Sequence, residues 1–288
     1  MSLITDVRLP VVQLVRVSVG HRAAAGGGPA LHEASVGFPE RTLTAVVGPS
    51  GAGKSTLLRC ASGLERPDGG KVFRGFRELD AMDDRELTEL RGLFVPRRPE
   101  LLPGLTVYRT VARTARATGR RSRRAAAMDA LCQVGLEEAA GRSVDGLSAE
   151  RRKRVAVAAT LVASPRILFI DEPTDSLDPA GARRVMDVLR ALVERAGRTV
   201  VMGTSDPQAA ARADRTVFLV AGRVAGKLDH PTADEVTAEL ARRQPTQADA
   251  PGPVTRAAGR AMVGETRPQG LDLTVMTCPD ADDAMDGC

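Results

Sequence analysis

Four short apolar runs mark the middle and later parts of the chain, at residues 43–47, 167–170, 199–203 and 216–220. Runs of this length are typical of β-strands. A helical stretch follows the second run, and its apolar residues recur at helical spacing: Val185, Val188, Leu189 and Leu192. Strand and helix therefore alternate, which predicts an α/β fold built around a parallel sheet with crossover helices.

The segment from about residue 92 to residue 163 has a different pattern. It contains helix signals and no convincing strand, so we expect a helical subdomain inserted between core strands. Near the N-terminus, two strand-like segments flank an Ala- and Gly-rich stretch at residues 23–30. This arrangement predicts an antiparallel β edge with a flexible loop.

The chain changes character after Arg243. Thr232 and Glu235 form a capping-box pattern that opens a last helix. Residues 244–288 are rich in Pro, Gly and Ala, with acidic residues gathered at the end, and cannot bury enough apolar surface to order themselves. We therefore predict one folded domain at residues 1–243 and a disordered C-terminal tail at residues 244–288.

Composition bears on the class of function. Hydrophobic residues make up 43% of the 288 residues, which is enough to fill a large core. Aromatic residues make up only 2%, with Tyr108 and no Trp, so the base-stacking platforms of single-strand nucleic-acid binders are almost absent. The formal net charge of +5 arises from mixed basic and acidic residues, which is typical of a solvated surface.

The cysteines and the apolar segments indicate a compartment. Cys60, Cys132, Cys278 and Cys288 lie far apart without C-x-x-C spacing, which suggests neither a zinc site nor a disulfide framework and fits a reducing cytoplasm. Charged residues and a proline interrupt the N-terminal segment, so it lacks the apolar stretch of a signal peptide. Because no run of about 18 apolar residues is free of charge, we expect no membrane-spanning segment.

The strongest chemical signal is GPSGAGKST at residues 48–56, directly after the first apolar run. It fits G-x-x-x-x-G-K-[ST], in which glycines let backbone N–H groups turn toward phosphate oxygens at a helix N-terminus. We expect Lys54 to bridge the β- and γ-phosphates of ATP, and Ser55 to ligate Mg²⁺. The predicted phosphate-binding residues are Gly48, Pro49, Ser50, Gly51, Ala52, Gly53, Lys54, Ser55 and Thr56.

A second signal follows the apolar run at residues 167–170, which ends in Asp171 and Glu172. Neighbouring residues at a strand end point in different directions, so one acid can serve a metal while the next faces the γ-phosphate. We assign Asp171 to Mg²⁺ and Glu172 to the general base that acts on the attacking water.

Together these motifs resemble the nucleotide-binding domain of an ATP-binding cassette (ABC) transporter over roughly residues 10–243. The P-loop, DEPT, the following SLDP and the segment ADRTVFLVAGRVAG stand in the family's order and at its approximate spacing. The segments TVVMGTSDPQAAARADRTVFLVAGRV and LLPGLTVYRTVA look most like the ATPases of bacterial lipoprotein-release and macrolide-export systems.

The resemblance implies a P-loop core that binds Mg-ATP and couples its hydrolysis to a separate transmembrane permease, at the inner face of the cell membrane. It also implies a homodimer or heterodimer, in which the P-loop and acid pair of one subunit and a signature L-S-G-G-Q of the other enclose each ATP. Asp178, within SLDP, would belong to this nucleotide site. Residues 92–110, which are apolar and basic, would bear on the permease, although an ordinary buried loop has a similar composition.

The signature position departs from the family pattern and reads Leu147, Ser148, Ala149, Glu150, Arg151. Ser148 keeps its hydroxyl. Glu150 replaces the second glycine and places a carboxylate where a backbone N–H is expected to approach the γ-phosphate. Two like charges about 4 Å apart cost about 4 kcal/mol at an effective dielectric of about 20. We expect this repulsion to oppose closure unless Glu150 swings away or Arg151 neutralises it.

Two further positions differ from the family pattern. Arg97 replaces the Q-loop glutamine; it cannot accept a hydrogen bond from water, though it could clamp phosphate oxygens. Ser205 replaces the switch histidine, so a histidine contact to the γ-phosphate is lost. His21 falls near the family's adenine-stacking aromatic residue, and both a weak stack and a solvated loop residue stay open.

These departures leave no composite site complete in either a homodimer or a heterodimer. We therefore expect ATP and Mg²⁺ to bind here and hydrolysis to be slow. Two alternatives stay open, an ATP-binding regulatory subunit that does not hydrolyse at a useful rate and a soluble ABC protein that acts on nucleic acid. The single domain and the shortage of aromatic residues disfavour the second, so we expect no nucleic-acid partner.

Overall fold

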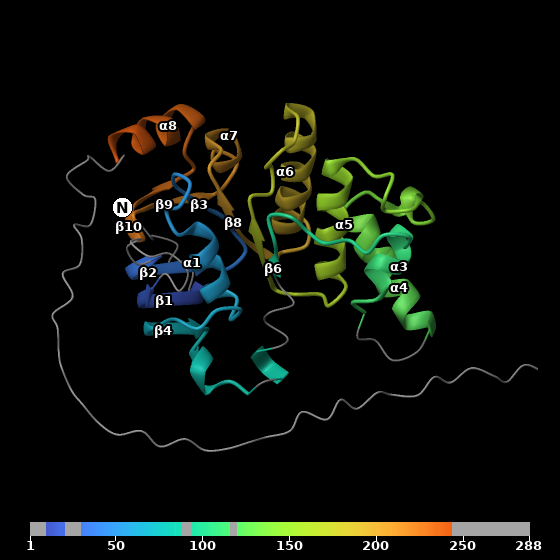
Figure 1. Ribbon diagram of the computed structural model, residues 1–288, viewed down its shortest axis with the longest axis horizontal. Helices are drawn as coiled ribbons and strands as arrows, with labels where there is room; N and C mark the ends of the chain where they lie inside the picture. The colour runs from blue at the N-terminus through green and yellow to red at the C-terminus, as the bar shows by residue number, and fades with distance from the viewer. Residues whose placement is uncertain (1–9, 21–29, 84, 88–93, 116–119, 244–288) are drawn as a thin grey trace, which may run out of the picture. The chain divides into compact units, whose positions relative to one another are not determined.

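The computed structural model describes residues 10–20, 30–83, 85–87, 94–115 and 120–243. Its larger sheet has six strands, in the spatial order β10 (Arg223–Asp229), β9 (Arg215–Val220), β3 (Leu43–Val47), β8 (Thr199–Thr204), β7 (Ile167–Asp171) and β6 (Phe94–Val95). Neighbouring strands are parallel, except that β10 runs antiparallel to β9. The four apolar runs of the sequence form β3, β7, β8 and β9 (Figure 1), so the predicted parallel sheet is confirmed.

The central strands are mostly apolar because both faces of the sheet are covered. Every residue of β3, β7 and β8 is buried. Successive side chains point to opposite faces. Leu168 and Ile170 of β7 join the cluster that includes residues 107–161 of the helical segment, whereas Ile167 and Phe169 join the cluster that α1 shares with the second sheet. There Phe169 meets Phe38 edge to face, with ring centroids 6.5 Å apart.

A second, antiparallel sheet has four strands in the order β2 (Leu31–Pro39), β1 (Pro10–Val19), β4 (Gly69–Arg74) and β5 (Arg77–Glu78). A short 3-10 turn, η1 (Leu79–Ala81), follows it. Helix α1 (Lys54–Ala61) contacts β1 of this sheet and β7 and β8 of the larger sheet, so it packs between the two (Figure 1). The predicted antiparallel β edge is therefore confirmed.

Three helices accompany the later strands. Helix α6 (Pro179–Glu194) and α7 (Pro207–Ala210) contact β3 and β8, and α8 (Ala233–Arg242) packs on α7. The helical repeat predicted between the strands is α6, which buries Val185, Leu189 and Leu192. The capping box that opens α8 is also confirmed, because Thr232 accepts from the Glu235 amide and Glu235 accepts from the Thr232 amide.

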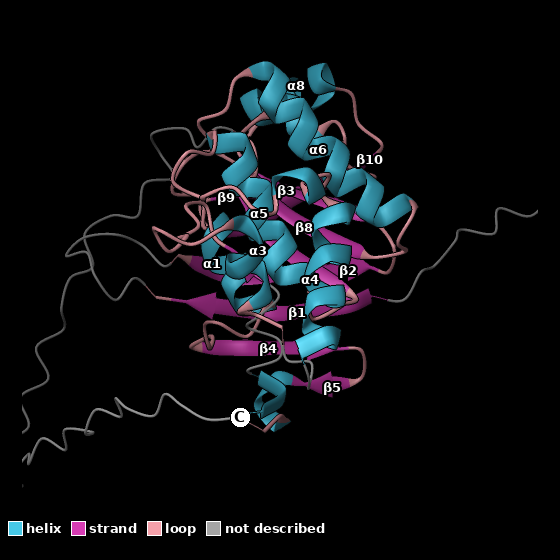
Figure 2. Cartoon of the chain, turned by 90° about the vertical axis from the view of Figure 1, so that its right-hand side faces the viewer, coloured by secondary structure: helices cyan, strands magenta, loops and turns pink. Residues whose placement is uncertain are grey.

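The helical subdomain consists of α3 (Val107–Ala112), α4 (Arg120–Gln133), the 3-10 turn η2 (Glu137–Ala139) and α5 (Ala149–Leu161), which face the viewer in Figure 2. The prediction that residues 92–163 contain no strand is wrong, because β6 pairs in parallel with β7 through Phe94 and Val95. Two residues are too few to show a strand pattern, and Pro96, which has no N–H to donate, follows directly.

Several predictions fall outside the described residues: the loop at 23–29, His21, the tail at 244–288, Cys278 and Cys288. Cys60 and Cys132 are free thiols, and burial raises the pKa of Cys60 to about 12. In the part of the chain that the structure describes, no helix is both long enough and apolar enough to cross a bilayer.

Candidate functional site

The loop between β3 and α1 depends on two glycines. Gly53 has φ +98°, and a Cβ atom there would lie 2.2 Å from the backbone oxygen of Ala30. A Cβ at Gly48 would lie 2.1 Å from the backbone oxygen of Leu219. No side chain fits at either position, so the loop must bring bare backbone to the start of α1. This is the geometry in which N–H groups at a helix N-terminus receive phosphate.

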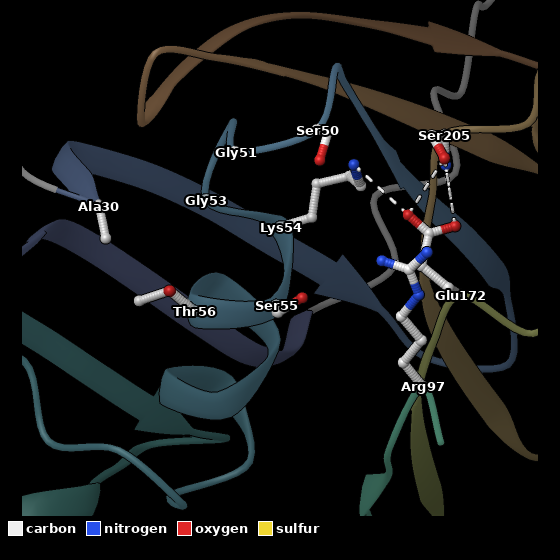
Figure 3. A pocket seen from close by; sticks show the side chains of 10 residues that line it. All are labelled: Ala30, Ser50, Gly51, Gly53, Lys54, Ser55, Thr56, Arg97, Glu172 and Ser205. Atoms are coloured by element: carbon white, nitrogen blue, oxygen red, sulfur yellow. Dashed lines mark hydrogen bonds and ion pairs between the residues drawn. The ribbon is translucent and has the colours of Figure 1, made fainter. Parts of the chain in front are cut away.

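The loop borders a cavity of about 260 Å³ (Figure 3). Its lining residues are Ala30, Ser50, Gly51, Gly53, Lys54, Ser55, Thr56, Arg97, Glu172 and Ser205. Nine of these ten were predicted from the sequence, and only Ala30 was not. Gly48, Pro49 and Ala52 belong to the loop without lining the cavity. The structure thus brings together predicted residues from four separate parts of the chain.

The Lys54 ammonium is held at the cavity wall. It donates to the carbonyl oxygens of Gly48 at 2.8 Å and Pro49 at 3.1 Å, and it lies 3.5 Å from Oε1 of Glu172. Lys54 and Glu172 are both 7% exposed. Breaking a buried pair of this kind leaves an uncompensated charge, so each side chain fixes the orientation of the other.

Ser55 and Asp171 form the part of the site suited to a metal. The Ser55 hydroxyl donates to Oδ2 of Asp171 at 2.7 Å. Oδ1 of Asp171 is buried and has no hydrogen-bond partner among the described residues. Hydroxyl and carboxylate oxygens are the ligands that Mg²⁺ prefers, and Mg²⁺ typically takes one or two protein ligands together with phosphates and water. An unpaired carboxylate oxygen beside a hydroxyl therefore fits Mg²⁺ at these two residues.

Glu172 has a backbone conformation that is rare for a residue with a side chain. Its φ is +44°, and its amide donates to the Gly203 carbonyl at 2.8 Å. Ser205 donates to its carboxylate through the hydroxyl, at 3.2 Å to Oε1, and through the amide, at 3.1 Å to Oε2. Strained backbone of this kind persists only where the surroundings fix it, and it is concentrated at functional sites. Ser205 therefore orients the carboxylate of the candidate base.

Arg97 reaches the cavity from the loop after β6. Its Nε and Nη2 donate to Asp175 at 2.9 and 2.8 Å, which is a bidentate arrangement. These hydrogen bonds hold the pKa of the Asp175 carboxyl below its ordinary value, so Asp175 stays charged at neutral pH. The sequence indicated Arg97 but not its partner, because the two residues lie 78 positions apart.

Lys153 is a second residue that the sequence did not indicate. It lies on α5, is 6% exposed, and donates to the carbonyl oxygens of Arg97 and, at 2.9 Å, Glu172. Burial lowers the pKa of its amine. The sequence does contain one signal for Lys153: the chain has only four lysines, and this one stands within a run of arginines.

The Glu150 carboxylate is neutralised inside its own subunit, though not by the predicted residue. Its side chain is 7% exposed and forms ion pairs with Arg154 and, at 3.8 Å, with Arg184. Arg151 instead donates its backbone N–H to the Ser148 hydroxyl, which caps α5. A Cβ at Gly181 would lie 3.2 Å from Cβ of Glu150, so the start of α6 packs against this side chain.

Ser148 and Asp178 do not line the cavity of their own chain. Ser148 is exposed at the start of α5, and Asp178 is exposed at the start of α6, where it accepts from the Gly181 amide at 3.1 Å. The sequence-based assignment of both to a nucleotide therefore requires a second subunit.

Comparisons with known proteins agree with this geometry. The family profile described as ABC transporter matches residues 31–175. The lipoprotein-releasing system ATP-binding protein LolD of Paramagnetospirillum magneticum is 40% identical over 185 residues, which cover 62% of this chain and 82% of that protein. The macrolide export ATP-binding/permease protein MacB of Burkholderia pseudomallei is 34% identical over 234 residues, which cover 80% of this chain and 36% of that protein. A dimeric ATP-binding cassette, solved bound to ADP and Pi, superposes with a TM-score of 0.68 at 30% identity and covers 76% of this chain and 99% of that one.

Proposed function

The chain belongs to the family of ABC transporter ATP-binding proteins. We propose that its cavity binds Mg-ATP and hydrolyses it slowly, and that this hydrolysis is coupled to a separate membrane permease. The observation that carries this proposal is the convergence of Lys54, the Ser55–Asp171 pair and the strained Glu172 on one cavity at the start of α1.

In this proposal the backbone N–H groups at the start of α1 and the Lys54 ammonium hold the phosphates. Ser55 and Asp171 hold Mg²⁺, which neutralises charge on the phosphate oxygens when it is bound. Glu172 orients the attacking water and accepts its proton, because Ser205 and Lys54 fix its carboxylate toward the cavity.

Two features of the cavity support slow hydrolysis. The Ser205 amide and hydroxyl both donate to the Glu172 carboxylate, so this short side chain is engaged there and does not replace a histidine contact to the γ-phosphate. Arg97 has no acceptor with which to orient water. The Glu150 carboxylate should oppose closure of the dimer less than the sequence suggested, because its charge is paired with Arg154 and Arg184 within the same subunit.

The partners follow from the family and from the surface beside the cavity. A hollow of about 650 Å³ lies next to Arg97, and its lining includes Pro96, Leu101, Leu102, Leu105 and Ala156. This hollow coincides with the segment expected to bear on a permease, and Leu102 is 47% exposed within it. We place the chain at the inner face of the cell membrane, as one subunit of a homodimer or heterodimer whose second subunit brings Ser148 to the nucleotide.

The direct test measures ATP binding and ATP hydrolysis on the same preparations. Lys54→Ala is expected to weaken ATP binding about 10- to 100-fold, because it removes charged hydrogen bonds to phosphate. Lys227→Ala is the matched control, since Lys227 is exposed on β10. Glu172→Gln is expected to keep ATP binding and to abolish the remaining turnover. Wild-type turnover as fast as that of an intact ABC transporter would refute slow hydrolysis.

A regulatory subunit that binds ATP without hydrolysis is the second candidate, favoured by the Arg97 and Ser205 positions. The assay of the permease complex separates the two. Turnover that stays at the Glu172→Gln level with the permease present supports the regulatory subunit, whereas turnover that Glu172→Gln removes supports the slow ATPase.

A further inference from the structure

The cavity contains one cation whose hydrogen-bonding capacity is not used up within the protein. A guanidinium has five N–H groups, and Arg97 commits Nε–H and one Nη2–H to Asp175. No hydrogen bond from Nη1 to another described residue is formed. Figure 3 shows the guanidinium extending toward Glu172 and Lys54 rather than toward Ala30 and Thr56. Asp175 therefore binds one edge of the guanidinium, and the other edge is available to a ligand.

The backbone of Arg97 is held as firmly as its side chain. The buried Lys153 ammonium bridges the carbonyl oxygens of Arg97 and Glu172, so one cation sets the position of the Arg97 backbone relative to that of Glu172. Burying an ammonium group is unfavourable unless it is well hydrogen-bonded, so this contact is specific. With both its backbone and its guanidinium held, Arg97 loses little conformational freedom when an anion binds.

The charges at the wall show why a second cation is needed there. The Lys54 ammonium lies 3.5 Å from the Glu172 carboxylate, so the charge of Lys54 is already partly neutralised by Glu172. A terminal phosphate that approaches Glu172 brings further negative charge beside that carboxylate. Arg97 is the other cationic side chain among the residues that line the cavity. Guanidinium groups match phosphate oxygens through paired N–H donors better than an ammonium does.

We propose that Arg97 binds the terminal phosphate of ATP, with Asp175 and Lys153 as positioning residues, so that the cavity distinguishes ATP from ADP. This inference rests on the proposed function, because it assigns one phosphate of the nucleotide to one side chain. ADP lacks that phosphate, so Arg97 contributes to ATP binding and not to ADP binding.

The test is isothermal titration of full-length protein with ATP and with ADP, at one fixed Mg²⁺ concentration. Arg97→Gln is expected to weaken ATP binding about 10- to 100-fold and to change ADP binding less than about twofold, because the lost hydrogen bonds are charged and local. Arg77→Gln is the matched control. Arg77 lies on β5 of the smaller sheet, also forms a bidentate pair, with Glu86, and does not line the cavity. It is expected to change neither affinity.

A double-mutant cycle tests the positioning role. Asp175→Asn is expected to lower the ATP-to-ADP preference by about 3- to 10-fold, and to have no further effect once Arg97→Gln is present, because Asp175 acts only through the guanidinium. A residue with only a structural role would weaken both nucleotides alike. Thermal unfolding of each variant identifies any that does not fold, and the remaining arms of the cycle still decide the question.

Three results would overturn the inference while leaving the proposed function intact. Arg97→Gln could weaken ATP and ADP equally, leave both unchanged, or tighten ATP, the last of which would mean that Asp175 sequesters Arg97. Failure of the proposed function looks different, because wild-type protein would then bind neither nucleotide, or Lys54→Ala would bind as the wild type does.

Discussion

The two sides of the cavity are built by different physical means. On one side the loop from β3 to α1 presents bare backbone, because Gly48 and Gly53 have no room for a Cβ atom. On the other side charged side chains set the geometry, through the pair of Arg97 with Asp175 and the bridge made by Lys153. Glu150, with Arg154 and Arg184, extends this second kind of construction along α5 and α6.

The difference indicates which parts of the site tolerate substitution. Steric exclusion permits no side chain at Gly48 and Gly53, so these two positions must stay glycine. Ion pairs can be exchanged when both partners change together. Among the positions that the sequence analysis interpreted as departures, Arg97 and Ser205 line the cavity outside the loop and Glu150 does not line it. Each of the three side chains has a partner within the chain.

The loop side should be the more sensitive to substitution. Gly53→Ala is expected to lower the free energy of unfolding by about 3–4 kcal/mol, because the new Cβ meets the Ala30 oxygen and the backbone is in a left-handed conformation. Urea unfolding measures the change. Gly141→Ala is the control, since its Cβ would meet nothing within 4 Å, and it should cost less than about 0.5 kcal/mol. Equal effects of the two variants would break the comparison.

On the charged side the largest effect is expected at Lys153. Lys153→Met should cost about 2–3 kcal/mol, because the carbonyl oxygens of Arg97 and Glu172 lose their donor. The preference of the Lys153→Met variant for ATP over ADP should also fall. A Met that stabilises the protein would show that the buried charge is a net liability.

The stability difference between the wild type and Lys153→Met should depend on pH, and this dependence checks the role of Lys153 independently. The pKa of Lys153 is lowered by burial, so the unfolded chain binds more protons in the window between the lowered value and the ordinary one. The contribution of Lys153 to stability should therefore rise as pH increases through that window, and fall as pH decreases through the lowered pKa. Urea unfolding of the wild type and Lys153→Met across alkaline pH measures the changing gap. A gap that narrows with rising pH would contradict the prediction.

Glu150→Gly introduces the residue that the sequence analysis expected at this position and should have a smaller effect. We expect a loss of about 1–2 kcal/mol, because Arg154 loses its carboxylate but still donates to the carbonyl oxygens of Val134 and Gly135. ATPase turnover should stay within about twofold of wild type, since the carboxylate is already paired. A rise of about tenfold, equivalent to about 1.4 kcal/mol, would show that Glu150 does oppose closure.

The smallest effect is expected at Arg184, whose side chain is 54% exposed and lies 3.8 Å from Glu150. Arg184→Gln should change the free energy of unfolding by less than about 0.5 kcal/mol, because exposed ion pairs contribute little. Urea unfolding at low and high salt measures it. A cost comparable to that of Glu150→Gly would mean that Arg184, rather than Arg154, neutralises the carboxylate.

The two sides also differ in how far the sequence predicts them. The loop and the acid pair follow directly after apolar runs, so a local pattern indicates both, and the structure brings Lys54 and Glu172 together as the motifs imply. The charged side depends on contacts between distant residues. Arg97 and Asp175 are 78 positions apart, and Lys153 reaches Arg97 across 56. Strand β6 was missed because a two-residue strand is specified by its neighbour β7 and not by its own pattern.

The Lys153 bridge also gives the chain a mechanical property. Arg97 stands between Pro96 and Arg98, which both line the hollow proposed to bear on a permease. Any displacement of that segment carries the Arg97 carbonyl with it, and the Lys153 ammonium connects that carbonyl to the carbonyl of Glu172. The side chain of Lys153 therefore links the hollow proposed to dock a permease to Glu172, the proposed general base, through two hydrogen bonds.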